Sequence, residues 1–400
     1  MSVQIGISET FPKTTQLVQR GKAINPLSNP KGQKFECELC GKPAYIQCKN
    51  CRLTYYCDKD HETIDFRGIH EKICQLIIPL RTPLGDFGSE EERAYREKQT
   101  RIRQMNLLEI TKIEAHKKLF ESQFDLAIPA ALQALRFSMD VYGQDSIELV
   151  PSYLLLGEAS IGLKQFSQAE DYLSLAKWAV LKADSACHPS IRAQLHRNLG
   201  LMFSSQGNYD AALLQLANDI FFSSIAKSPD HITTSGGYFQ LGNVFQKLGR
   251  LEDATATFDK VISIWKLFLK EKTKFLNEAQ QAEAVQILTT IHSFRSVHMN
   301  SSVTSAAEVM YVLAQLYNTC NKFDKAKACA ERALETYESA LGRDHSMTVE
   351  VKIFYKGIVV DDKDSSPSSR IQSANSKSRK HSINGMMRRT SSVNSASPSH

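Results

Sequence analysis

Eight residues whose side chains commonly bind metal ions lie within residues 37–74. They follow the order C-x2-C, C-x2-C, C-x3-H and H-x3-C, and they are Cys37, Cys40, Cys48, Cys51, Cys57, His61, His70 and Cys74. A structural zinc site uses four Cys or His ligands, so eight ligands complete two sites. Because no ligand position is left for water, the pattern predicts two structural zinc ions and argues against a catalytic metal.

Short local elements must bring these ligands together. A helix expected over about residues 65–77 places His70 and Cys74 four positions apart, on one face. Each C-x2-C pair turns two sulfurs towards one ion. The segment has few apolar residues, so metal binding must supply much of its folding free energy. Spacing alone permits both sequential and interleaved sites.

Residues 37–74 resemble a MYND-type zinc finger, including the aromatic pair Tyr55-Tyr56 before the fifth ligand. The resemblance implies interleaved sites, formed by Cys37, Cys40, Cys57 and His61 and by Cys48, Cys51, His70 and Cys74. The sixth ligand is usually cysteine in this family and is histidine here. Some MYND fingers bind proline-rich peptides through a glutamine and a tryptophan. Glu62 and Phe66 stand at those positions, which argues against that activity.

The sequence from about residue 104 to residue 358 repeats with a period of about 42 residues. Gly157, Gly200 and Gly242 mark three copies, and Ala115 and Ala314 mark two more. Large residues follow nine and sixteen positions later in the three glycine copies, and alanine follows twelve positions later. Such a period predicts helix pairs that stack into a solenoid. The interval of 72 residues before the last copy predicts an extra helical insert near residues 263–300.

The repeats resemble tetratricopeptide repeats, in a long form similar to those of kinesin light chains. The resemblance implies that the first helix of each pair lines a concave face that binds peptides. The residues placed on that face include Glu158 and the candidate partner-binding residues Arg197, Asn198, Phe239, Gln240, Asn243, Tyr311 and Gln315. The alternative is that these residues form ordinary solvated helix faces.

The predicted fold is therefore all-α: a tetratricopeptide-type helical solenoid with a small N-terminal two-zinc finger and disordered tails. The expected segments are a disordered stretch (1–33), the finger (34–78), a charged helical linker (79–103), the solenoid (104–358) and a disordered Ser-rich basic tail (359–400). We expect the finger and the solenoid to fold independently. In the tail, Ser382 and Ser391 follow basic residues and are candidate phosphorylation sites.

Composition and motifs narrow the function. The finger carries six Lys or Arg and six acidic residues, so it has no basic footprint for nucleic acid. No secretory signal, membrane-length apolar run or catalytic motif is present, which predicts no membrane span, no small-molecule substrate and no enzymatic activity. The favoured function is a cytoplasmic scaffold that binds protein partners through the solenoid groove and the finger. Resemblance to other MYND and tetratricopeptide proteins implies a role in dynein-type complexes of cilia or flagella. The alternative is a transcriptional corepressor adaptor.

Overall fold

The computed structural model describes residues 21–23, 34–82, 89–271, 275–298 and 303–358. Most of the two segments expected to be disordered lies outside the described residues, and so do Ser382 and Ser391. The described residues all fall within one compact unit of the chain, which ends at Val359. Within them, no helix is long and apolar enough to cross a membrane.

The finger is built from a small antiparallel sheet followed by short helices. Strand β2 (Ile46–Cys48) lies between β1 (Gly21–Ala23) and β3 (Tyr55–Tyr56). The helices are α1 (Lys59–Asp65), the π-helix η2 (Phe66–His70), α2 (Glu71–Ile73) and α3 (Ile78–Arg81). The sequence predicted no helix or strand before residue 34, so strand β1 is an element that the sequence analysis missed. It forms because β2 would otherwise leave one edge of backbone N–H and C=O groups unpaired.

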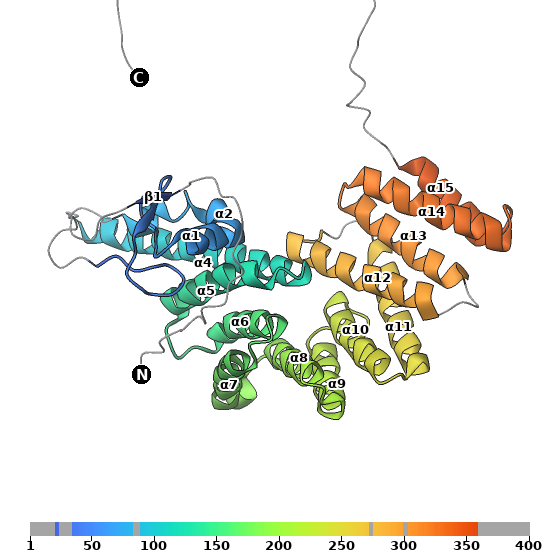
Figure 1. Ribbon diagram of the computed structural model, residues 1–400, viewed down its shortest axis with the longest axis horizontal. Helices are drawn as coiled ribbons and strands as arrows, with labels where there is room; N and C mark the ends of the chain where they lie inside the picture. The colour runs from blue at the N-terminus through green and yellow to red at the C-terminus, as the bar shows by residue number, and fades with distance from the viewer. Residues whose placement is uncertain (1–20, 24–33, 83–88, 272–274, 299–302, 359–400) are drawn as a thin grey trace, which may run out of the picture. The chain divides into compact units, whose positions relative to one another are not determined.

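Five helical hairpins follow the finger and account for the five repeat copies (Figure 1). They are α4 (Glu90–Phe120) with α5 (Phe124–Tyr142), α6 (Val150–Gly162) with α7 (Phe166–Ala183), α8 (Pro189–Ser205) with α9 (Tyr209–Ala226), α10 (Ile232–Lys247) with α11 (Leu251–Lys270), and α13 (Val303–Thr319) with α14 (Phe323–Leu341). Helix α12 (Glu278–His298) lies between the fourth and fifth hairpins, and α15 (Ser346–Gly357) follows the last. Short 3-10 helices cover Ile147–Leu149 and Asp184–Ala186.

The repeat positions have a direct packing reason. A Cβ atom added to Gly200 would lie 2.8 Å from the Leu216 side chain, sixteen residues later on the partner helix. The equivalent pairs, Gly157 with Leu173 and Gly242 with Phe258, are also in contact. Glycine therefore lets the two helices of each hairpin cross closely while the large residue fills the crossing.

The turn inside each hairpin requires a residue with left-handed backbone conformation. This residue lies seven positions after the glycine or alanine that marks each repeat copy. Glycine supplies it at Gly207 and Gly249, where φ is 81° and 73°. The other three copies use Ser122, Lys164 and Asn321, with φ between 57° and 60°. These L-residues adopt a conformation that costs free energy relative to glycine. Lys164 therefore forms the same turn as Gly207 and Gly249, but with a strained backbone.

Two of the expected boundaries need correction, one at the start of the solenoid and one at its insert. Helix α4 runs without a break from Glu90 to Phe120, so the charged linker and the first repeat helix are one element. Ser89 caps it by accepting a hydrogen bond from the Glu92 backbone N–H. The insert is also shorter than expected, because α11 continues to Lys270 and only α12 is added. Helix α12 packs against both α13 and α4.

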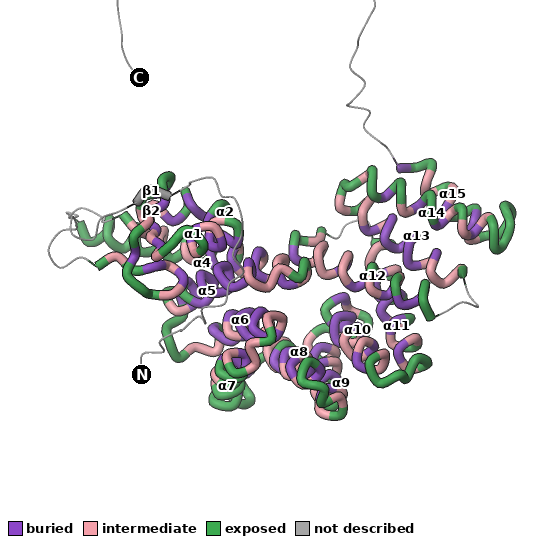
Figure 2. The backbone as a smooth tube through the Cα atoms, in the orientation of Figure 1, coloured by how far each residue is buried: buried purple, intermediate pink, exposed green. Residues whose placement is uncertain are grey.

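One hydrophobic core joins the finger to the first hairpins (Figure 2). It contains Tyr56, Ile69 and Ile73 of the finger together with Leu107 of α4 and Leu135 of α5. The two elements also approach closely at Gly68, where an added Cβ would lie 2.7 Å from the backbone oxygen of Leu126 in α5. The finger and the start of the solenoid therefore share one core, whereas the sequence predicted two separate units. Their boundary is a packed interior.

Candidate zinc sites and the solenoid cavity

The first group of ligands comprises Cys37, Cys40, Cys57 and His61, whose ligand atoms all lie within 4.8 Å of one another. The Nδ1 atom of His61 lies 3.0 Å from Cys57 Sγ and 3.4 Å from Cys37 Sγ. The short helix α1 carries His61, and Asp58 caps that helix by accepting a hydrogen bond from the His61 N–H at 2.8 Å. The cap orders the first turn of α1, where His61 sits.

The second group comprises Cys48, Cys51, His70 and Cys74, all buried and again within 4.8 Å of one another. Here His70 uses its other ring nitrogen: Nε2 lies 3.3 Å from Cys48 Sγ and 3.6 Å from Cys51 Sγ. The hydrogen bond with Cys48 is the main cause that lowers the pKa of Cys51, against the effect of burial, which favours the thiolate form of this sulfur. Thiolate sulfur is the form that binds metal.

Both groups fit zinc. With Zn–S bonds of about 2.3 Å and Zn–N bonds of about 2.0 Å, a tetrahedral ion would hold its ligand atoms roughly 3.5–3.8 Å apart. The measured separations of 3.0–3.6 Å are close to those edges. The arrangement is interleaved, as the family resemblance implied. The eight residues thus form two structural zinc sites, each of which would hold one ion with four protein ligands.

Two residues behind the ligands, Asp65 and Tyr56, position His70, a role that the sequence assigned to neither. Its Nδ1 atom lies 3.8 Å from Asp65 Oδ2, and Tyr56 donates a hydrogen bond to the same oxygen at 2.6 Å. Burial raises the pKa of Asp65 to about 6. A carboxylate behind a ligating histidine fixes the orientation of the ring. The position of Tyr56 in the aromatic pair was visible in the sequence, but its role behind the metal site was not.

The first zinc knuckle is also tied to the helices by Glu38. Its carboxylate accepts hydrogen bonds from Arg81 of α3 at 2.7 and 3.0 Å and from Gln133 of α5 at 2.6 Å, and it pairs with Arg136 of α5. Burial alone would raise the pKa of Glu38, but the two arginines outweigh it and lower the pKa to about 2. The finger is therefore held to α5 by charge as well as by apolar packing.

Four of the seven candidate partner-binding residues line a single cavity of about 460 Å³. Arg197 and Asn198 on α8 and Phe239 and Gln240 on α10 contribute to it, together with Glu158 on α6. Residues of α4 and α12 complete the wall. The face predicted to be open is thus partly covered by the insert helix. Phe239 is only 4 % exposed and belongs to the hydrophobic core.

The remaining candidates do not join that cavity. Tyr311 on α13 is buried, donates a hydrogen bond to Glu350 of α15 at 3.1 Å, and has its pKa raised to about 12 by burial and by that carboxylate. Its phenol is therefore not open to a partner, because α15 packs over it. Gln315 lies one turn further along α13. The amide of Asn243 donates to Gln240 at 3.2 Å.

Asp219 stands where the other repeat copies have alanine or valine, and this cavity explains the exception. It is fully buried and accepts a hydrogen bond from Arg197 Nε at 2.7 Å and another from Ser223 at 3.0 Å. Arg197 also donates to the Thr233 backbone oxygen at 2.8 Å. The exception to the repeat pattern is thus half of a buried ion pair that fixes the orientation of Arg197.

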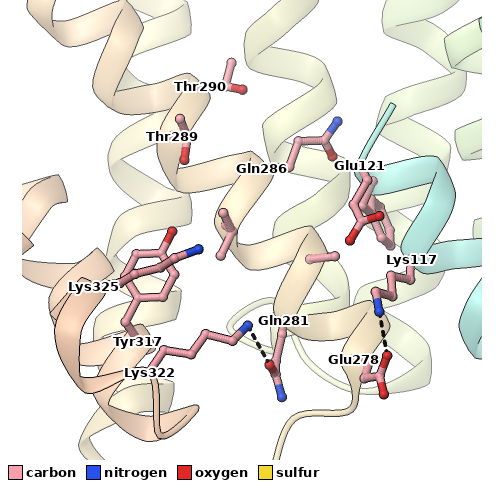
Figure 3. Close-up of a pocket in the computed structure, with 13 residues that line it drawn as sticks. Lys117, Glu121, Glu278, Gln281, Gln286, Thr289, Thr290, Tyr317, Lys322 and Lys325 are labelled. Carbon is pink, nitrogen blue, oxygen red and sulfur yellow. Dashed lines mark hydrogen bonds and ion pairs between the residues drawn. The ribbon is translucent and has the colours of Figure 1, made fainter. Parts of the chain in front are cut away.

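Helix α12 is anchored at both ends. Near its start, Glu278 pairs with Lys117 of α4 at 2.7 Å and with Lys72 of the finger at 3.1 Å. Figure 3 shows Lys117 and Glu278 at one side of a second cleft, of about 690 Å³, between α4, α12, α13 and α14. Near the end of α12, the buried Arg295 pairs with Asp259 of α11 and Glu308 of α13. The insert therefore links the first hairpin to the last two.

These features define a chain in which a MYND-type finger is followed by a tetratricopeptide-type helical solenoid. Residues 37–74 match the family model of the MYND finger. Residues 235–264 and 307–346 match family models of the tetratricopeptide repeat. The MYND match begins at Cys37 and ends at Cys74, the first and last predicted zinc ligands. The described residues show no separate catalytic domain beside these two elements.

Similarity to individual proteins is local or distant. The finger region is 40 % identical over 38 residues to programmed cell death protein 2 of Mus musculus, covering 10 % of this chain and 11 % of that protein. The chain thus spans about a tenth of the length of this curated relative. Among solved structures, BtubC from P. vanneervenii is 16 % identical, with a TM-score of 0.37, over 71 % of this chain and 94 % of that chain. Aspartyl phosphate phosphatase F from Bacillus subtilis is 13 % identical, with a TM-score of 0.34, over 75 % and 84 % respectively.

Proposed function

We propose that this protein is a non-enzymatic scaffold that binds a protein partner through the solenoid cavity, with the zinc finger as a rigid end of the solenoid. The observation that carries the proposal is the convergence of Arg197, Asn198 and Gln240 on one cavity from different hairpins. Polar side chains beside apolar ones can hold the backbone and side chains of a partner segment. The zinc sites have four protein ligands each, so their role is structural.

The finer part of the proposal concerns the assembly that the scaffold serves. The order of finger and repeats resembles zinc finger MYND domain-containing protein 12, and by resemblance to MYND and tetratricopeptide proteins we propose assembly or docking of dynein-type complexes in cilia or flagella. The proposed location is the cytoplasm and the ciliary or flagellar axoneme. The competing function is a corepressor adaptor that works through the finger. In the finger, Glu62 is buried, which disfavours the peptide grip that this alternative needs.

Affinity capture of the zinc-loaded full chain, with partners identified by mass spectrometry, tests the proposal. One variant changes the cavity wall (Gln194→Lys with Gln240→Lys), and a matched variant changes exposed finger residues (Tyr45→Ser with Leu76→Ser). Dynein-arm or axonemal proteins retained by the finger variant and lost by the cavity variant would support the proposal. Corepressor proteins lost only by the finger variant would replace it with the alternative function.

A further inference from the structure

The centre of the solenoid cavity contains more carboxylates than cations. Arg197 pairs with one of them, Asp219, and the charges of Glu283 of α12 and Glu158 of α6 lie near enough to act on it. Most of its donors are already used, because Nε and Nη2 bond to Asp219 and Nη2 also bonds to Thr233. Of the cationic residues that line the cavity within the described part of the chain, two others remain. Lys112 pairs with Glu109, and Lys227 is exposed beyond the end of α9.

Glu158 and Glu283 are thus left without a cation of their own. Burial raises the pKa of both carboxyl groups, to about 7 for Glu158, and Arg197 only partly offsets the effect. The neighbouring His116 supplies no charge, because burial lowers its pKa to about 4. Both side chains are partly buried, and carboxylates removed from water without a partner are costly, so a cation that entered the cavity would relieve that cost.

A glycine brings the charged groups of α8 and α12 together. A Cβ added to Gly236 of α10 would lie 2.7 Å from Arg197 Nη1 and 3.1 Å from Glu283 Oε1. Any side chain there would push the two groups apart or out of the cavity. The carboxylate of the insert helix therefore reaches the cavity centre because α10 carries no side chain at this point.

A second, independent feature is an unused acceptor. Asn198 is 5 % exposed and lines the cavity, and its Nδ2 donates to the Gln194 backbone oxygen at 3.2 Å. Its buried Oδ1 accepts no hydrogen bond from any residue that the structure describes. A buried acceptor without a donor destabilises the protein, so a ligand that brings N–H groups would be favoured.

We infer that the cavity binds an arginine side chain of the partner segment, with Glu158 and Glu283 pairing its guanidinium and Asn198 Oδ1 accepting one of its N–H groups. This inference rests on the proposed scaffold function and names the partner chemistry. A guanidinium supplies five donors in a planar fork, which suits two carboxylates and an amide oxygen. The cavity of about 460 Å³ lies within the size range of specific ligand sites. Because Glu283 comes from α12, the site needs the insert as well as the repeats.

Pools of ten-residue peptides test the inference with the zinc-loaded full chain. The pools are identical except for one central residue, which is arginine, its uncharged isostere citrulline, or glutamate. A charged hydrogen bond contributes about 1.5–3 kcal/mol, so the intact protein should retain the arginine pool at least about tenfold better than the citrulline pool. The variant Glu158→Gln with Glu283→Gln should lose this preference. The control Glu335→Gln, at an exposed position on α14, should keep it.

Three results would overturn the inference. They are equal retention of the arginine and citrulline pools, an arginine preference that survives in the double variant, and a preference for glutamate, which would make Arg197 the anchor. Circular dichroism of each variant checks that it is folded. Failure of the scaffold function is distinguished separately: if the double variant still captures the same cellular partners as the intact chain, the scaffold stands and only the arginine site is wrong.

Discussion

Replacing Glu38 with glutamine is expected to weaken the connection between the zinc finger and the first helical hairpin. The Glu38 side chain is 11 % exposed. It pairs with Arg81 at the end of the finger and with Arg136 of α5, and it accepts a hydrogen bond from Gln133 of α5. Glutamine keeps the shape and one acceptor oxygen but removes the charge. Arg81 would then have only neutral acceptors, namely the remaining side-chain oxygen at position 38, Thr54 Oγ1 and the Leu53 backbone oxygen.

The magnitude follows from the electrostatics of this cluster. Despite burial, the arginines lower the pKa of Glu38 from 4.5 to about 2. At ~1.4 kcal/mol for each pKa unit, that difference stabilises the charged, folded form by about 3 kcal/mol. Removal of one partner from a buried ion pair typically costs about 3–5 kcal/mol. Because glutamine retains some hydrogen bonding, we expect a loss of about 2–3 kcal/mol in the free energy of unfolding.

Urea denaturation of the zinc-loaded protein at neutral pH, followed by far-UV circular dichroism, measures this loss. The matched control is Glu36→Gln, the same change two residues earlier at an exposed position. It should change the free energy of unfolding by less than about 0.5 kcal/mol. If Glu38→Gln cost no more than the control, the charge cluster would not hold the finger to the solenoid, and the reasoning would be refuted.

Three further changes test the packing. Lys164→Gly should stabilise the protein by about 0.5–1 kcal/mol, because it relieves a φ of 60°, whereas Gly207→Lys should destabilise it in thermal denaturation. Gly68→Ala should lower the free energy of unfolding by about 1–3 kcal/mol in the same assay, because the added Cβ would meet a backbone oxygen of α5. The control Gly357→Ala, at a position with open space around it, should leave the stability unchanged. Removal of zinc with a chelator should increase hydrogen exchange in α5 as well as in the finger, because they share a core; exchange confined to residues 34–82 would show that the finger folds alone.

Much of the zinc centre could be predicted from the sequence, because ligand chemistry depends on residue type and short spacing. The eight ligands and their division into two groups lie where the pattern and the family resemblance put them. The contacts behind the ligands could not be predicted in the same way. Asp65 and Glu38 look like ordinary surface carboxylates in the sequence. Their roles depend on Tyr56 and on α5, which reach them only in the folded chain.

The repeat register was also readable, because each hairpin buries the same small and large positions. Gly200 and Leu216 are sixteen residues apart in the sequence and in contact in the structure. The periodic pattern did not reveal which faces stay open. Phe239 and Tyr311 were expected on a binding surface, and both are buried. The covering elements, α12 and α15, lie outside the repeat period.

By itself, the sequence determined the two zinc sites, the helical hairpins and their turns, since each depends on residues close together in the chain. Only the tertiary structure decided that the finger and α5 share one core, that α12 closes the solenoid cavity, and that Glu158, Arg197 and Glu283 meet there. Those contacts join residues many tens of positions apart. They arise from the way whole helices pack, and no local pattern records that packing.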